Sequence, residues 1–220
     1  MEETLNKRLC QVSKYAEWLE IILISIGVFL VPIIVPNLLA TIFGQTSFIA
    51  TNSQYVVGTL VNTALIMAAI NISGWKKIIG IVTLPSISAM LSGYVFQTAT
   101  IYTVYMIPAI WIGNFLLIYL YKHLFINKNI NYIISSIAAI LFKVIVIYMG
   151  FMLLLQLAII PNGTKIAEAL GLAMGINQAI TAVSGAMLSY MIMKIAYKRK
   201  EEPAWKNMYV QYVDMFMMKK

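Results

Sequence analysis

Residues 132–155 read YIISSIAAILFKVIVIYMGFMLLL, and Lys143 is the only charged residue in this run. A helix that crosses a bilayer needs about 20 predominantly apolar residues, so this run predicts a transmembrane helix. Further apolar runs of similar length lie near residues 21–43, 55–73, 78–97, 104–121 and 169–193. The sequence therefore predicts an all-α integral membrane protein: a bundle of six transmembrane helices with a C-terminal interfacial amphipathic helix.

The composition supports this fold class and excludes several others. Of the 220 residues, 61% are hydrophobic and only 11% are charged, whereas soluble domains have about 25% charged residues. A water-soluble enzyme, a disordered tail and a secreted disulfide scaffold are thereby excluded. One cysteine, Cys10, cannot form an internal disulfide, and one histidine, His123, leaves no Cys/His cluster for zinc. We therefore predict no metal site and no cofactor.

The distribution of basic residues predicts the orientation in the membrane. The net charge is +8, and the lysines and arginines gather near the N-terminus, around Lys76, around Lys122 and after Lys194. The loops at 44–54 and 98–103 have no charged residue. Because cytoplasmic loops are enriched in lysine and arginine, we predict a multi-pass protein of the cell (plasma) membrane with both termini in the cytoplasm. Because the basic residues lie in predicted cytoplasmic segments, the topology explains the positive net charge, and we predict no nucleic-acid partner.

This orientation divides the chain into three regions. Residues 1–20 are expected to form a cytoplasmic amphipathic arm, residues 21–193 the transmembrane domain, and residues 194–220 a basic cytoplasmic tail. In the tail, aromatic and methionine residues recur at three- and four-residue steps from Trp205 to Phe216. Such a helix is expected to lie on membrane lipid at the cytoplasmic surface, and docking on a partner protein is the alternative.

Lys143 is the most informative polar residue of the predicted spans. It stands about 17 Å from the start of its helix at 1.5 Å per residue, where a charge costs at least about 2.5–3.5 kcal/mol. All eight acidic residues lie outside the predicted spans, so no internal counter-ion is expected. We therefore hypothesise that Lys143 faces a polar cavity and holds an anionic group of a ligand. The alternative is a neutral lysine that donates to asparagine side chains or backbone carbonyls.

Other polar side chains within the spans are the remaining candidates for a binding site. Buried amides cost free energy unless they are paired, so they should face the interior of the bundle. They can bind a solute there, or they can simply join one helix to another. The predicted substrate-binding residues are Asn62, Asn114, Lys143, Asn177 and Thr181, with Gln54 and Gln97 near the outer mouth.

Pro32 and Pro36 stand in the outer half of the first span. Proline removes a backbone donor and clashes with the preceding turn, so this half is expected to kink or unwind. A broken helix that lines a site and a tolerated kink are both consistent with the pattern.

Residues 58–121 resemble a known family of transport proteins. An amide-bearing span is followed by GWKKIIGIVTLPSISAMLSGYVFQ (74–97) and YMIPAIWIGNFLLIYLYK (105–122), and the last span contains GINQAITAVSGAMLSYMI (175–192). This pattern is similar to the substrate-binding S component of energy-coupling factor (ECF) type micronutrient importers. The resemblance implies capture of a small solute, such as a vitamin, and uptake driven by a transmembrane coupling protein and ATPase subunits. It also implies a partner-docking face made of small residues, namely Ser88, Ala89, Ser92 and Gly93.

Two other classes of function are compatible with the sequence. The chain could be a stand-alone membrane transporter or scaffold protein. It could also be a membrane thiol peptidase that uses Cys10 and His123, which are both predicted to be cytoplasmic. Catalysis would need these two side chains within hydrogen-bond reach and a third group to orient them. No motif surrounds either residue, so we do not expect an enzyme.

Overall fold

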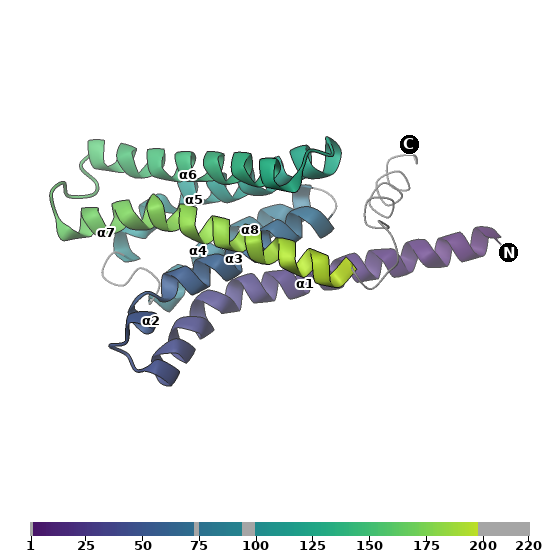
Figure 1. The fold of residues 1–220 in the computed structure, drawn as a ribbon, viewed down its shortest axis with the longest axis horizontal. Helices are drawn as coiled ribbons and strands as arrows, with labels where there is room; N and C mark the ends of the chain where they lie inside the picture. The colour runs from purple at the N-terminus through teal and green to yellow at the C-terminus, as the bar shows by residue number, and fades with distance from the viewer. Residues whose placement is uncertain (1, 73–74, 94–99, 198–220) are drawn as a thin grey trace.

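A computed structural model describes residues 2–72, 75–93 and 100–197, and every regular element in these ranges is helical. Figure 1 shows their arrangement. The elements in chain order are α1 (Glu2–Phe43), α2 (Phe48–Thr51), α3 (Ser53–Asn71), α4 (Trp75–Ser92), α5 (Thr100–Leu120), the π-helix η2 (Tyr121–Asn127), α6 (Tyr132–Gln156), α7 (Lys165–Met174) and α8 (Ile176–Tyr197). The predicted all-helical class is confirmed for the described residues.

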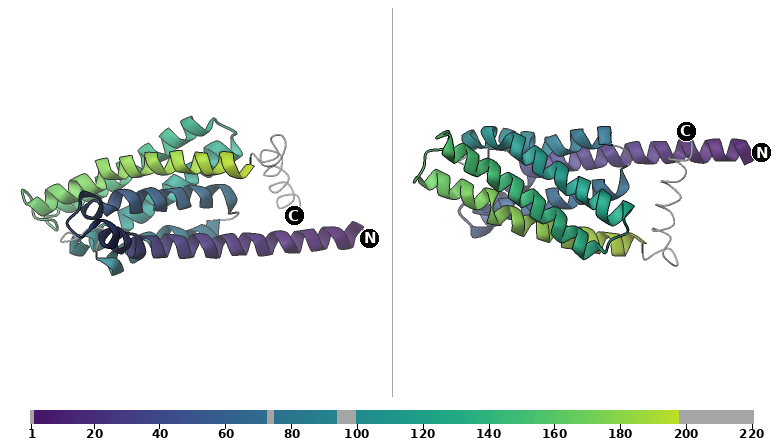
Figure 2. Two further views of the ribbon diagram at one scale, coloured as in Figure 1. Left: turned by 60° about the horizontal axis from the view of Figure 1, so that its bottom comes forward. Right: turned by 90° about the horizontal axis from the view of Figure 1, so that it is seen from above.

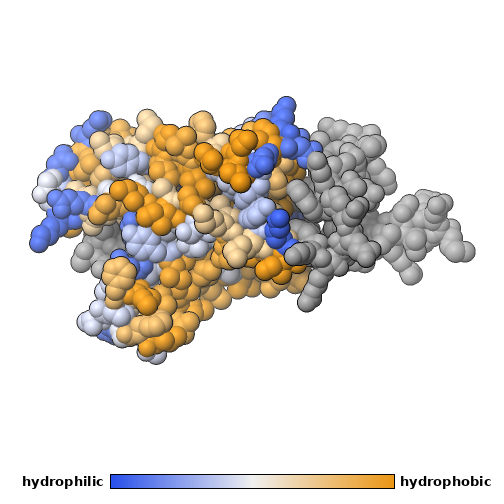
Figure 3. Space-filling model, viewed as in Figure 1, coloured by the Kyte–Doolittle hydropathy of each residue, from blue (hydrophilic) through white to orange (hydrophobic). Residues whose placement is uncertain are grey.

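Five helical segments are long and apolar enough to cross a membrane. They are Trp18–Phe43, Ser53–Asn71, Ile101–Asn127, Tyr132–Gln156 and Lys165–Ile195. On the face shown in Figure 3, hydrophobic residues cover most of the side of the bundle and strongly hydrophilic ones gather toward its ends. The protein is therefore a multi-pass membrane protein. The apolar part of α4, Lys77–Ser92, is shorter than a full span, so the sixth transmembrane helix stays a prediction.

The helices pack most closely in three pairs: α3 with α8, α5 with α6, and α1 with α4. Among the candidate spans, α3 has the largest buried share and α1 the smallest, which places α3 at the centre. In Figures 1 and 2, α8 ends at the end of the bundle from which the N-terminal half of α1 projects. That this end faces the cytoplasm stays a prediction.

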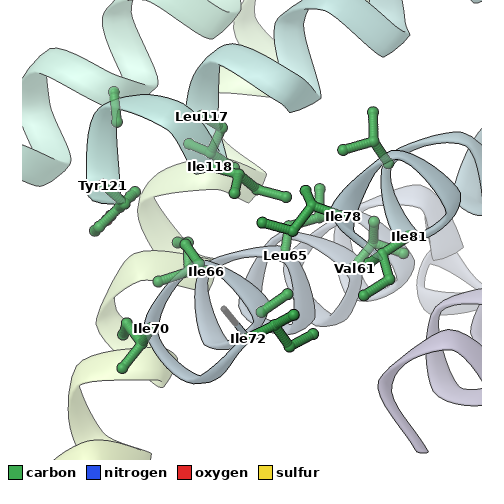
Figure 4. Packing of buried hydrophobic residues seen from close by; sticks show 14 of the residues in the cluster. Val61, Leu65, Ile66, Ile70, Ile72, Ile78, Ile81, Leu117, Ile118 and Tyr121 are labelled. Atoms are coloured by element: carbon green, nitrogen blue, oxygen red, sulfur yellow. The ribbon is translucent and has the colours of Figure 1, made fainter. Parts of the chain in front are cut away.

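Two hydrophobic clusters form the interior. The larger one joins α3, α4 and the second half of α5, where Leu65, Ile78 and Leu117 are almost completely buried (Figure 4). The smaller one joins α5, α6 and α7 through residues such as Ile110 and Ile147. The region between the two clusters contains the polar side chains described below.

Helix α1 continues through both prolines. It runs from Glu2 to Phe43 with Pro32 and Pro36 inside it, so the helix does not unwind there, and the kink stays a prediction. The Asn37 side chain donates to the Ile33 carbonyl of the same helix at 2.8 Å. Residues 2–20, predicted as a separate arm, belong to the same helix as the first span. The amphipathic helix predicted in the tail falls on residues 198–220, which are outside the described residues.

Candidate functional site

Three of the predicted binding residues meet in the middle of the bundle. The Lys143 ammonium, on α6, donates to Asn62 Oδ1 on α3. Asn62 Nδ2 in turn donates to Thr181 Oγ1 on α8 at 3.3 Å. The Thr181 hydroxyl donates onward to the Gln178 carbonyl at 3.2 Å. A continuous chain of hydrogen bonds therefore joins α6, α3 and α8, and we call Lys143, Asn62 and Thr181 the polar triad.

Two glycines allow α3 and α8 to come close enough for this chain. A Cβ atom on Gly185 would lie 2.6 Å from Asn62 Cβ and 3.0 Å from the Thr59 carbonyl oxygen. A Cβ atom on Gly58 would lie 2.7 Å from a methyl carbon of Thr181. Small residues at a helix interface let two backbones approach in this way. Glycine at both positions is thus required to bring the amide and hydroxyl of the triad within reach.

Gly185 and Ser189 were not among the predicted site residues, although both lie on the face of α8 that packs on α3. Ser189 is completely buried. Its hydroxyl donates to the Gly185 carbonyl at 2.7 Å. The regular four-residue spacing of Thr181, Gly185 and Ser189 was the signal that could have identified this face.

Lys143 has no acidic partner within the described part of the chain. The residue is 2% exposed, and Asn62 is its hydrogen-bond partner. All acidic residues were expected to lie outside the spans, but Glu20 and Glu168 fall within the candidate spans of the structure. Both are exposed and lie near the ends of their segments. A buried charge is normally paired or makes several hydrogen bonds. Lys143 is therefore a buried amine whose hydrogen-bond partner is one neutral amide.

Asn114 is buried on the inward face of α5 without a hydrogen bond from its side chain to any described residue. It is 3% exposed and lies on the same face as Ile110 and Leu117. All completely enclosed side-chain nitrogen and oxygen atoms in the described ranges have partners, so the Asn114 amide is not completely enclosed. The neighbouring Trp111 donates from its indole nitrogen to Ser86 Oγ at 2.6 Å.

The remaining predicted binding residues lie away from the triad. Asn177 Oδ1 accepts a hydrogen bond of 2.8 Å from the Tyr55 hydroxyl, near the first residues of α3 and α8. Gln54 is half-buried beside Tyr55. Gln97 lies outside the described residues. The predicted residues thus form two groups. The polar triad lies in the middle of the bundle, whereas Gln54 and Asn177 lie near the end of the bundle that is farther from the basic loops.

The small residues predicted to dock a partner are mostly used within the chain. Ser88 and Ala89 are buried, and the Ser88 hydroxyl donates to the Phe29 carbonyl of α1. Ser92 is half-buried and Gly93 is exposed, at the end of α4. A partner that contacted Ser88 directly would have to displace α1.

The thiol-peptidase alternative stays a hypothesis, because the structure describes the side chain of only one of its two residues, His123. The His123 ring, in η2, stacks on the Tyr119 ring at a centroid distance of 5.8 Å. The side chain of Cys10 lies outside the described part, so its distance from His123 stays open. In the described ranges, no group of three or more His, Cys, Asp and Glu residues could hold a metal ion.

Replacing Tyr55 by phenylalanine is expected to cost little stability. The change removes one hydrogen bond between α3 and α8, and such bonds between membrane helices average about 0.6 kcal/mol. Equilibrium unfolding in mixed micelles measures the difference. A loss above about 2 kcal/mol would contradict the view that Tyr55 and Asn177 only join two helices that already pack closely.

Comparisons with known proteins identify no relative: no family model, no curated protein and no solved structure matches the chain.

Proposed function

We propose that this protein is the membrane-embedded substrate-capture subunit of a multi-subunit solute importer powered by partner ATPases. Its substrate is a small solute, such as a vitamin or another micronutrient, that includes an anionic group. The protein would lie in the cell membrane with both termini in the cytoplasm. The observation that supports this proposal best is the buried Lys143 ammonium, which has one neutral partner, Asn62.

An ionisable residue within a membrane span is costly and is usually retained for a function. Lys143 lies on α6 between the two hydrophobic clusters, where it can neutralise an anionic group that has left water. The amide of Asn62 and the hydroxyl of Thr181 add hydrogen-bonding groups to the same region. A basic group with an adjacent amide and a hydroxyl, enclosed by apolar helices, is a suitable site for a small polar solute.

The resemblance of about residues 55–195 to S components supports the same function and supplies the expected partners. S components capture the solute and depend on a coupling protein and ATPases for uptake. Purification of the tagged protein in mild detergent, followed by mass spectrometry of proteins and retained small molecules, tests this proposal. We expect ATPase subunits and a transmembrane coupling protein to co-purify. Recovery of the chain alone, with solute uptake that continues after ATP depletion, would favour a stand-alone transporter.

Replacing Lys143 by methionine is expected to weaken retention of the solute by about 10- to 100-fold. Hydrogen bonds to charged groups contribute about 1.5–3 kcal/mol, and each 1.4 kcal/mol is a factor of ten. Methionine has a similar length, so membrane insertion should be unchanged. The measurement is the amount of solute per mole of purified protein.

Lys165→Met is the matched control, because Lys165 is exposed at the start of α7. It should retain the solute as the unmodified protein does. Equal retention by the Lys143→Met variant would contradict the proposed site.

A further inference from the structure

We infer that the solute has a single carboxylate on an otherwise apolar body, and that Lys143 and Asn114 together hold this carboxylate. The inference rests on the proposed function, because it assigns the chemical class of solute to the same site. It adds Asn114 as a binding residue with a defined role, and it excludes solutes with two or more charges.

The register of α5 against α6 places Asn114 opposite Lys143. The segment Ile101–Asn127, in which α5 continues into η2, runs antiparallel to α6. The hydroxyl of Tyr121, the first residue of η2, donates to Ser136 Oγ on α6 at 2.7 Å. Asn114 stands seven residues, or about two helical turns, before Tyr121, and Lys143 stands seven residues after Ser136. The backbone agrees, because a Cβ atom on Gly113 would lie 3.2 Å from the Lys143 carbonyl oxygen. The two polar residues therefore occupy the same level of the interface.

The two side chains have donors that the protein itself does not use. An ammonium has three N–H donors, and Asn62 accepts from Lys143. The Asn114 amide has two further N–H donors, and its side chain bonds to no described residue. A carboxylate accepts with two oxygens and about four lone-pair sites. One carboxylate can thus accept from both residues and neutralise the single positive charge.

The surroundings determine the rest of the solute. On the level next to Asn114 and Lys143, Ile110 and Ile147 belong to the smaller hydrophobic cluster, and Ile140 belongs to the larger one. Among the described residues, Lys143 is the only buried one with a basic side chain. A second negative charge would remain unpaired in this region, at high cost. An apolar body with a single carboxylate satisfies both the charge and the apolar walls.

Matched pairs of acids and amides test the inference directly. The probes are benzoate with benzamide, hexanoate with hexanamide, and indole-3-acetate with indole-3-acetamide, each added to the purified full-length protein. A ligand that binds the folded state raises the unfolding temperature progressively with its concentration. We expect at least one acid to raise this temperature while its amide does not. Lys143→Met should abolish the shift, and Asn114→Leu should weaken acid binding by about tenfold.

The Asn114→Asp variant gives a second test. Aspartate has nearly the same shape as asparagine, so the variant should still fold. It places a carboxylate opposite Lys143, so we expect a higher unfolding temperature without any probe and no further shift with the acids. Asn162→Asp, at an exposed position between α6 and α7, should retain the response to acids. The inference is overturned if no acid shifts the transition, if amides act as well as acids, or if Asn114→Asp still responds.

The result is distinguishable from the test of the proposed function. Acid binding that needs Lys143, in a protein that co-purifies with no ATPase, would retain the carboxylate site and reject the importer subunit. If ATPases co-purify but no acid shifts the unfolding temperature, the importer subunit would be retained and the carboxylate site rejected.

Discussion

Replacing Asn62 by leucine is expected to lower the free energy of unfolding by about 1–3 kcal/mol. Leucine has a similar volume but no acceptor, so the Lys143 amine loses its Asn62 partner. A buried donor that is left without an acceptor costs the desolvation free energy of that group. Equilibrium unfolding in mixed micelles, followed by circular dichroism, gives the value.

The double variant Asn62→Leu with Lys143→Met identifies the origin of that loss. An apolar pair in place of a buried polar one is often neutral or stabilising, so most of the stability should return. The control is Asn37→Leu, because Asn37 is exposed and its side chain bonds only within α1. If the double variant is as unstable as Asn62→Leu alone, Lys143 does not depend on Asn62.

Replacing Gly185 by alanine is expected to destabilise the protein by about 1–3 kcal/mol, the usual cost of overpacking a well-packed interior. The added Cβ would lie 3.0 Å from two backbone atoms of α3, the Thr59 carbonyl oxygen and the Thr63 nitrogen. Backbone atoms cannot turn aside as a flexible side chain can, so α3 and α8 must separate. The hydrogen bond from Asn62 to Thr181 should weaken with them.

The same substitution at Gly80 should have the opposite sign. Gly80 also lies within a helix, α4, but a Cβ atom there meets nothing within 4 Å. Alanine in a helix interior is favoured over glycine by about 0.8–1.0 kcal/mol, so Gly80→Ala should be neutral or stabilising. Comparison of the two unfolding curves checks both predictions, and equal effects would contradict the close packing of α3 on α8.

The helices were largely predictable from apolar run length, because backbone groups in a membrane must be paired within each segment. The predicted span at 132–155 and the observed α6 (Tyr132–Gln156) differ by one residue at the C-terminal end. The ends of α4 were less predictable. Its apolar run was expected to reach Gln97, but the helix ends at Ser92. Gly93 follows with a φ of +67°, a left-handed conformation that glycine adopts readily and that ends helices.

The candidate site was predictable in part. Polar residues inside apolar runs identified Lys143, Asn62 and Thr181, since such residues avoid lipid. Which of them bond to one another depends on how the helices pair, and single-span periodicity does not contain that information. For this reason the pairing of Asn177 with Tyr55 and the lack of a partner for Asn114 emerged only from the structure.

The most direct test of the central claim is the oxygen accessibility of spin labels at two adjacent positions on α6. Phe142 is 51% exposed and Lys143 is 2% exposed, so they should face lipid and the interior respectively. Labels are attached to the Phe142→Cys and Lys143→Cys variants after Cys10, the sole cysteine, is replaced by serine. In lipid vesicles we predict frequent collisions with dissolved oxygen at position 142 and rare ones at position 143. Equal collision rates at both positions would contradict an interior Lys143 and, with it, the proposed site.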